Sequence, residues 1–180
     1  MIVMKFGGSS VSDAGRIRAA GEIVRGRLSQ KPVVVVSAFR GVTDELLGLA
    51  KDALRGDLSR LAGLRKRHEG TAAELGVDFA PCRPLFDELE SLAKGVALLK
   101  ELTPRTLDHA ASFGERLSSR LIAAAWAKAG LPARAVDAHA AGLLTDARFG
   151  AANPLPEADA ALKASLGAAA DVCVVTGFIG

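Results

Sequence analysis

The strongest constraint on the fold comes from short runs of apolar, largely β-branched residues at Ile2–Phe6, Pro32–Ser37 and Val172–Thr176. Each run is continuous rather than alternating, which is typical of strands covered on both faces in a parallel sheet. A weaker fourth candidate lies at Arg134–Val136. The sequence therefore predicts an α/β fold in which a mostly parallel sheet is sandwiched by helices.

The segment that joins the first two runs predicts a helix. Within Asp13–Gln30 the apolar residues recur at helical spacing, and Ser12 or Asp13 can cap the start. A strand, a helix and a second strand in succession form a βαβ unit. Such a unit joins parallel strands by a right-handed crossover.

The middle of the chain has helical patterns only. Amphipathic segments rich in Leu and Ala cover Thr43–Leu54, Leu58–Leu75, Pro84–Lys100 and Arg105–Ala129, and one more helix is expected at Ala158–Ala170. We expect Thr43 to be the N-cap of the first of these helices. The strand-free stretch from Leu58 to Lys100 predicts a helical insertion in the middle of the fold. The basic run Arg65–His68 predicts a solvated helix face.

Composition excludes several classes of function. The chain has 180 residues, of which 49% are hydrophobic and 24% charged, as expected for one domain with its own core. It shows no signal-peptide or membrane-span pattern, so we predict a cytoplasmic location and no membrane partner. A net charge of +3 and only 4% aromatic residues argue against nucleic-acid binding. Cys82 and Cys173 lie far apart and the histidines stand singly, so no metal site is predicted.

The first strand ends in Lys5-Phe6-Gly7-Gly8-Ser9 and leads toward the first helix. Glycines allow a tight turn and bring backbone amides close to a ligand, and a helix N-terminus attracts anions. A lysine at this point adds a full positive charge. The segment predicts a phosphate-binding loop, although a simple strand-to-helix turn would also require small residues.

The second strand ends in a similar way. Ser37 follows the strand, Gly41 provides a turn, and Thr43 begins the next helix. Ligands of open α/β sheets bind beyond the carboxyl ends of the strands, so Ser37 and Thr43 are expected beside the Lys5 loop. Helix capping alone would explain Thr43, but it would not explain Ser37.

A third candidate site interrupts an otherwise apolar helix. Glu115, Ser118 and Ser119 lie three and four residues apart and share one helix face. A carboxylate on such a face suits a substrate ammonium group, whereas the alternative is a solvated glutamate beside Arg116. Two weaker polar segments lie at 145–150 and 176–180.

The motifs, taken in order, resemble those of aspartokinases over essentially all 180 residues. The resemblance is carried by Lys5-Phe6-Gly7-Gly8-Ser9-Ser10-Val11, Val35-Val36-Ser37-Ala38 with Gly41-Val42-Thr43, Phe113-Gly114-Glu115-Arg116-Leu117-Ser118, and Thr176-Gly177-Phe178-Ile179-Gly180. It implies a three-layer fold of the amino-acid kinase type and ATP-dependent phosphorylation of the β-carboxylate of L-aspartate. The product is 4-phospho-L-aspartate, which enters lysine, threonine and methionine biosynthesis. ATP, Mg²⁺ and a homo-oligomeric assembly are implied as well.

The resemblance also assigns roles by position. It implies that the Lys5 loop holds the transferring phosphate, with Lys5 as the catalytic charge, and that a second group of residues binds aspartate. The phosphate group comprises Lys5, Phe6, Gly7, Gly8 and Ser9, and the aspartate group comprises Ser37, Thr43 and Glu115. Glu115 would face the substrate ammonium group. Lys5 and Mg²⁺ would offset charge on the phosphoryl oxygens.

Some features depart from the family pattern. Arg40 stands where family members more often have a small residue, and Asp44 stands where many have asparagine. Aspartokinases also continue beyond the point that corresponds to Gly180. Residues 1–180 are therefore expected to be the N-terminal portion of the kinase domain, without the C-terminal nucleotide-binding half and the ACT domains.

Two alternatives remain open at this point. One is a kinase of another small carboxylate, such as a glutamate 5-kinase or an acetylglutamate kinase, although the helix with Glu115 argues against it. The other is a truncated, non-catalytic module that binds aspartate or a partner subunit.

Overall fold

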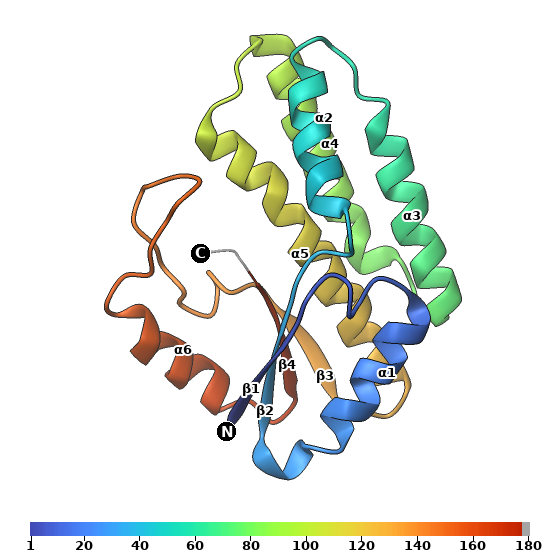
Figure 1. Ribbon diagram of the computed structural model, residues 1–180, viewed down its shortest axis with the longest axis vertical. Coiled ribbons are helices and arrows are strands. Elements are labelled where there is room, and N and C mark those ends of the chain that lie inside the picture. Colours follow the sequence, from blue (N-terminus) through green and yellow to red (C-terminus); the bar gives the residue numbers. More distant parts are fainter. Residues whose placement is uncertain (178–180) are drawn as a thin grey trace.

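A computed structural model describes residues 1–177 of the chain. Its centre is a parallel sheet with the strand order β1-β2-β4-β3. The strands are β1 (Ile2–Phe6), β2 (Pro32–Val36), β3 (Ala133–Val136) and β4 (Val172–Thr176). The predicted parallel α/β fold is confirmed, and the strand bounds agree with the prediction within one residue. The carboxyl ends of the strands all point toward the helical end of the molecule (Figure 1).

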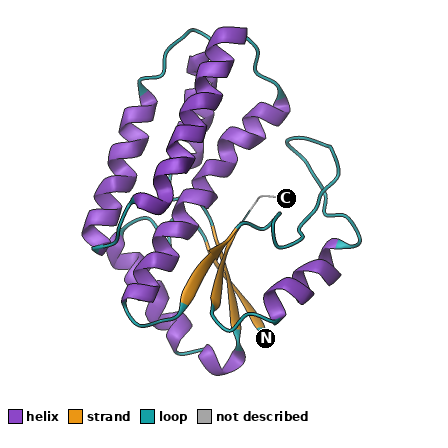
Figure 2. Ribbon diagram, turned by 180° about the vertical axis from the view of Figure 1, so that it is seen from behind, coloured by secondary structure: helices purple, strands orange, loops and turns teal. Residues whose placement is uncertain are grey.

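Two helices cover one face of the sheet and one covers the other. Helices α1 (Ala14–Arg25) and α5 (Pro104–Lys128) pack on the face that presents Val34, Val36 and Val174. Helix α6 (Ala158–Gly167) packs against the opposite face, beneath Val33, Cys173 and Val175 (Figure 2). The three layers follow from continuous valine runs, because strands of this kind have apolar side chains on both faces.

The expected helical insertion is present beyond the carboxyl ends of the strands. It contains α3 (Arg60–Leu75) and α4 (Arg83–Leu99), which pack with the preceding helix α2 (Val42–Ala53) and with α5 (Figure 1). Short 3₁₀ helices lie at Leu28–Gln30 and Ala80–Cys82. The helices therefore form a bundle above the sheet edge where the candidate loops lie.

Strand β1 differs from the prediction, because only one of its faces is covered. Its residues alternate between half-buried and exposed, and Val3 is 68% exposed. Strand β1 lies at the end of the strand order, and α6 packs beneath β2, β3 and β4 instead. An apolar run indicates a strand, but its sequence does not reveal which neighbours will cover it.

Helix boundaries confirm one predicted cap and correct another. Asp13 caps α1, and its carboxylate accepts a hydrogen bond from the Arg16 amide at 2.9 Å. That helix ends at Arg25, so it is shorter than predicted. Thr43 does not cap α2, because Gly41 occupies the N-cap position with φ +80° and Thr43 lies in the first turn. A left-handed backbone favours glycine over threonine at that position.

The basic run on α3 is not wholly solvated. Lys66 is exposed, but His68 is completely buried, with its ring stacked on Phe39 and edge-on to Phe86. The prediction was wrong for His68 because α3 packs this side against the loop that follows β2. No helix within residues 1–177 is long and apolar enough to cross a membrane.

Candidate active site

The turn after β1, for which the sequence predicts a phosphate-binding loop, is closed by a backbone hydrogen bond and lies beside Lys5. The Ser10 amide donates a hydrogen bond to the Gly7 carbonyl at 2.8 Å, which closes the turn. A Cβ built on Gly7 would lie 3.9 Å from Lys5 Nζ, so the ammonium group of Lys5 lies over its own glycine turn. Arg16 of α1 donates to the Ser9 carbonyl at 2.9 Å. The turn therefore combines accessible backbone with a mobile cation.

Gly8 brings this turn against the loop that follows β2. A Cβ on Gly8 would lie 2.7 Å from the Ala38 carbonyl oxygen, which is too close for any residue other than glycine without a backbone shift. The Ser37 amide also donates to the Phe6 carbonyl at 3.1 Å. The two loops are thus neighbours, as expected for the carboxyl ends of adjacent parallel strands.

Helix α5 holds the same loop from the other side. A Glu115 carboxylate oxygen accepts a hydrogen bond from the Ala38 amide at 3.2 Å, and Ser118 donates to the Ser37 carbonyl at 2.9 Å. Gly114 allows this close approach, since a Cβ there would lie 2.6 Å from the Ala38 Cβ. Ala38 is therefore the point where the glycine turn, the loop after β2 and α5 meet.

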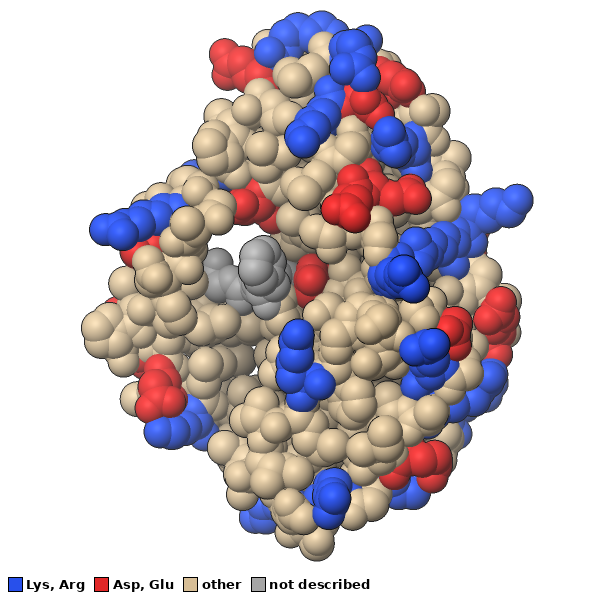
Figure 3. Space-filling view, viewed as in Figure 1, with Lys and Arg blue, Asp and Glu red and all other residues tan. Residues whose placement is uncertain are grey.

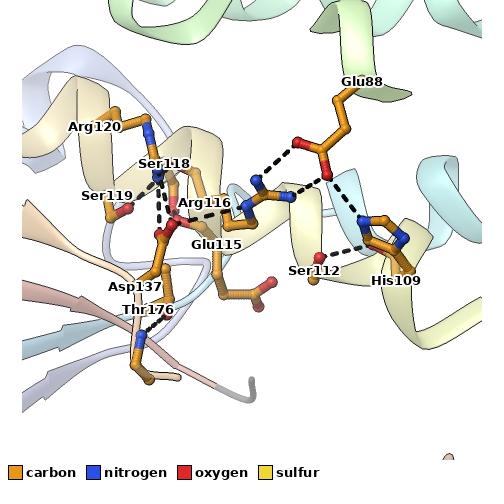
Figure 4. Close-up of polar contacts among 11 residues, drawn as sticks. Glu88, His109, Ser112, Glu115, Arg116, Ser118, Ser119, Arg120, Asp137 and Thr176 are labelled. Carbon is orange, nitrogen blue, oxygen red and sulfur yellow. Dashed lines mark hydrogen bonds and ion pairs between the residues drawn. The ribbon is translucent and has the colours of Figure 1, made fainter. Parts of the chain in front are cut away.

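Glu115 is buried and is not part of an ion pair within residues 1–177. It is 6% exposed, and burial raises the pKa of its carboxyl, an effect that the Ala38 amide partly offsets. Figure 4 shows its carboxylate directed away from the neighbouring arginines. A buried carboxylate of this kind carries an unfavourable desolvation energy that an incoming cation can relieve.

The arginines of α5 are engaged elsewhere. Arg116 forms two hydrogen bonds with Glu88, at 3.1 and 2.8 Å, and Arg120 forms a bidentate pair with Asp137 at 2.9 Å for each bond (Figure 4). The bonds from Arg116, with a smaller effect from His109, lower the pKa of Glu88 against the effect of its burial. Glu115 is therefore not neutralised by Arg116, and the alternative of a solvated glutamate is wrong.

A cleft of about 670 Å³ opens beside these residues. Thr43 and Glu115 line it, together with Ser112, Arg116 and residues of the loop that precedes α6. Figure 3 shows this face hollowed between that loop and the helices, with acidic side chains near the rim. Neither Lys5 nor Ser37 is among its lining residues, although both belong to the adjoining loops. Ser37 contacts the turn after β1 and α5 through its backbone, and its role toward a ligand stays a prediction.

The weaker sequence candidates have mainly structural contacts. The Asp146 carboxylate accepts hydrogen bonds from the amide and the side chain of Asn153, each at 3.2 Å, which closes the loop before α6. Thr176 accepts a hydrogen bond from the Ala138 amide at 2.9 Å, and the Gly177 amide donates to Val36 at 2.8 Å. Residues 178–180 of the last motif lie outside the described part of the chain.

Some contributors were missed by sequence reasoning. Ala38 has no functional group that would distinguish it, and the pairing of Glu88 and Asp137 with the arginines of α5 joins segments far apart in the chain. Nothing in the local sequence identifies those partners. The one sequence feature that could have indicated the contacts of Ala38 is the small residue between Ser37 and Phe39, because a loop that is crowded from two sides requires a small side chain.

Comparison with known proteins agrees with this geometry. The family model described as the amino acid kinase family matches residues 1–180. Aspartokinase 3, chloroplastic, of Arabidopsis thaliana is 38% identical over 188 residues, which covers 99% of this chain and 34% of that protein. An aspartokinase of Chlamydia muridarum is 34% identical, covering 85% of this chain and 33% of its own length. The chain therefore spans about a third of the length of these relatives.

Solved structures show the same relationship. The crystal structure of E. coli aspartokinase III in complex with aspartate and ADP (R-state) superimposes with a TM-score of 0.82 at 27% identity. It covers 99% of this chain and 40% of that one. The form of the same enzyme in complex with lysine and aspartate (T-state) gives a TM-score of 0.75. The resemblance to aspartokinases is confirmed, and the chain belongs to the amino acid kinase family.

Proposed function

We propose that this chain provides the aspartate-binding and phosphate-binding part of an aspartokinase. The observation that carries the proposal is Glu115: a buried carboxylate, turned away from the arginines of its helix, which lines a cleft with Thr43 and contacts Ala38 beside the Lys5 turn. An amino acid offers the ammonium group that such a carboxylate would bind. A solved structure similar to this chain is described as a complex with aspartate and ADP.

In the proposed reaction an oxygen of the aspartate β-carboxylate attacks the γ-phosphorus of ATP. The bond from that phosphorus to the bridging oxygen breaks, and ADP leaves with the electron pair. Thr43 and Glu115 orient the amino acid, while Lys5 and the amides of Gly7 and Gly8 bind the phosphoryl oxygens. Positioning and charge neutralisation are the main tasks of a protein in phosphoryl transfer.

The nucleotide and Mg²⁺ fit this chain differently. The ammonium of Lys5 over the Gly7 turn suits a phosphate group. Residues 1–177 contain no cluster of three His, Cys, Asp or Glu side chains able to hold a metal ion. Mg²⁺ that accompanies a nucleotide takes only one or two protein carboxylates, and its other ligands are phosphate oxygens and water.

The first experiment tests aspartate recognition by calorimetry with this chain. Wild type is expected to bind L-aspartate more tightly than L-glutamate or N-acetylglutamate. Glu115→Gln should weaken aspartate binding by about tenfold or more, because it removes a charge-assisted contact with the ammonium group. The matched control is Glu69→Gln, an exposed glutamate on α3, which should leave the affinity unchanged. Equal binding by both variants, or preference for glutamate, would contradict the assignment.

The second experiment separates a kinase from a binding module. Coupled ADP release is measured with aspartate for this chain and for a longer chain that continues as the relatives do. Lys5→Ala should abolish turnover while aspartate still binds, because the lysine acts on the phosphoryl group. Lys51→Ala, on the surface of α2, is the control. Aspartate binding without turnover in either chain would favour the non-catalytic module.

A further inference from the structure

The loop between β2 and α2 is held from two sides. Helix α5 contacts its first half, through Glu115 at Ala38 and Ser118 at Ser37. Helix α3 contacts its second half, at Phe39 and Arg40. Thr43 lies in the first turn of α2, shortly after this loop. The contacts that α3 makes with Phe39 and Arg40 therefore help to determine where Thr43 lies in the cleft.

Arg67 makes the polar contact from α3. Its guanidinium donates a hydrogen bond to the Arg40 carbonyl at 2.7 Å. An arginine remains charged at every physiological pH, and a charged donor makes a stronger bond than a neutral one. Arg40 immediately precedes Gly41, the left-handed N-cap residue, which has no side chain with which to fix the turn. Arg67 thus supplies an external restraint at the start of α2.

His68 makes the apolar contact from the same turn of α3. Its ring stacks on Phe39 with centroids 5.3 Å apart, and meets Phe86 edge-on at 5.6 Å. Nδ1 lies 2.8 Å from the Leu64 carbonyl, so Nδ1 carries the proton. Nε2 is buried and has no hydrogen-bond partner within the described residues. The neutral imidazole therefore acts as a flat packing surface for Phe39.

We propose that Arg67 and His68 are positioning residues that fix Phe39 and Arg40, so that Thr43 keeps its place in the lining of the cleft with Glu115. Neither residue lines the cleft. The identity of the ligand rests on the proposed function, whereas the restraint on the loop does not. Arg40 takes part through its backbone carbonyl, and its side chain is exposed.

Amide hydrogen exchange measured by NMR tests the restraint directly. The reporter is the Val42 amide, which bonds to the Phe39 carbonyl at 2.9 Å, and the reference is the Val34 amide in the centre of the sheet. Arg67→Met should increase the exchange rate of the Val42 amide by about tenfold, because the variant lacks one charged hydrogen bond. The exchange rate of the Val34 amide should change by less than about twofold. Arg67→Lys should recover part of the protection. Lys66→Met, the exposed neighbour on α3, is the matched control.

The stacking contact is tested at His68. His68→Phe keeps an aromatic ring against Phe39 and should retain slow Val42 exchange, whereas His68→Leu should accelerate it. If Arg67→Met and Lys66→Met give the same Val42 exchange rate, the proposed restraint is refuted. Equal exchange in the Phe and Leu variants would refute the part assigned to His68.

Aspartate titration then connects the restraint to ligand binding. Arg67→Met should raise the aspartate Kd about fivefold to tenfold, and Lys66→Met should not change it. Faster loop exchange with an unchanged Kd would refute the positioning role. If wild type itself does not bind aspartate, the proposed function fails, and the exchange rates still decide whether α3 restrains the loop.

Discussion

At Ala38 a single methyl group lies among three chain segments. The Ala38 carbonyl faces Gly8, the Ala38 amide donates a hydrogen bond to Glu115, and the Ala38 Cβ lies against Gly114. No side chain larger than alanine would fit there without moving α5 or the glycine turn, since packed interiors accommodate added atoms poorly. The site therefore depends on the small size of Ala38 and on the absence of a side chain at Gly8 and Gly114.

Gly114→Ala tests this crowding. The new Cβ would lie 2.6 Å from the Ala38 Cβ, so the variant should lose about 1–3 kcal/mol of unfolding free energy, measured by urea denaturation. Gly63→Ala on α3 is the control, because a Cβ there meets nothing within 4 Å. That variant should gain about 0.5–1 kcal/mol from improved helix propensity. Equal effects of the two substitutions would show that α5 can move away from Ala38.

His68 predicts how stability depends on pH. Burial, with a contribution from Arg67, lowers the pKa of His68 to about 4 from its ordinary value of 6.5, despite the bond to Leu64. The unfolded chain therefore takes up a proton first, and the free energy of unfolding falls as pH drops from 6.5 to 4. The loss over that range is about 3 kcal/mol.

His68→Phe removes this proton uptake and isolates it. Denaturant titrations at pH 7.5 and pH 4.5 should show a smaller difference for the variant than for wild type. The remaining pH dependence belongs to other groups, including Glu115, whose raised pKa acts in the opposite sense. Identical pH profiles for wild type and variant would mean that His68 is not buried as a neutral ring.

At the scale of elements, the sequence was most informative where side chains determine local structure. The valine runs located β2 and β4, and Asp13, one of the two cap candidates beside Ser12, caps α1. Errors arose where tertiary packing decides. Val3 is exposed because no helix within residues 1–177 covers its face of β1, and His68 is buried because α3 packs on the loop after β2. Neither the exposure of Val3 nor the burial of His68 can be predicted from the residues adjacent to it in the sequence.

In the candidate site, too, local sequence predicts some features and tertiary packing decides the others. Lys5, Gly7, Gly8 and Glu115 could be selected from residue type and spacing, and the structure brings their segments together at Ala38. Which of them line the cleft could not be predicted, because α5 and the loop before α6 define it. The partners of Arg116 likewise depend on how α4 packs against α5.

Arg120 of α5 pairs with Asp137, which follows β3, and this pair is expected to contribute to stability. Burial opposes ionisation of Asp137, but the hydrogen bonds and charge of Arg120, with Arg116, give it a lowered pKa. Arg120→Met leaves the carboxylate with Arg116 alone, at 3.9 Å, and should cost about 2–4 kcal/mol in a thermal or urea unfolding experiment. Adding Asp137→Asn should restore part of this loss, because the amide carries no charge. A double variant less stable than Arg120→Met would contradict the explanation.

For the molecule as a whole, the open face of β1 is the most exposed apolar part of the sheet. Met1 and Val3 are exposed, and Ile23 of α1 is an exposed apolar residue on another element. Val3→Lys should reduce self-association of the chain several-fold in sedimentation velocity at high concentration, because a charge on an edge strand opposes pairing between copies. Ile23→Lys is the control for a general charge effect. Unchanged association in the Val3 variant would exclude this face as the cause.

The place of β4 between β2 and β3 has a consequence for the order of folding. Val34 pairs with Val174, so the two central strands are separated by most of the chain. On a ribosome, β1, α1 and β2 emerge long before their neighbour, and the free side of β2 stays open until β4 inserts. Contacts this distant in sequence form slowly and expose strand edges meanwhile. Strand β4 thus joins β2 to β3, and the bond from the Gly177 amide to the Val36 carbonyl lies directly beside the loop that carries Ala38.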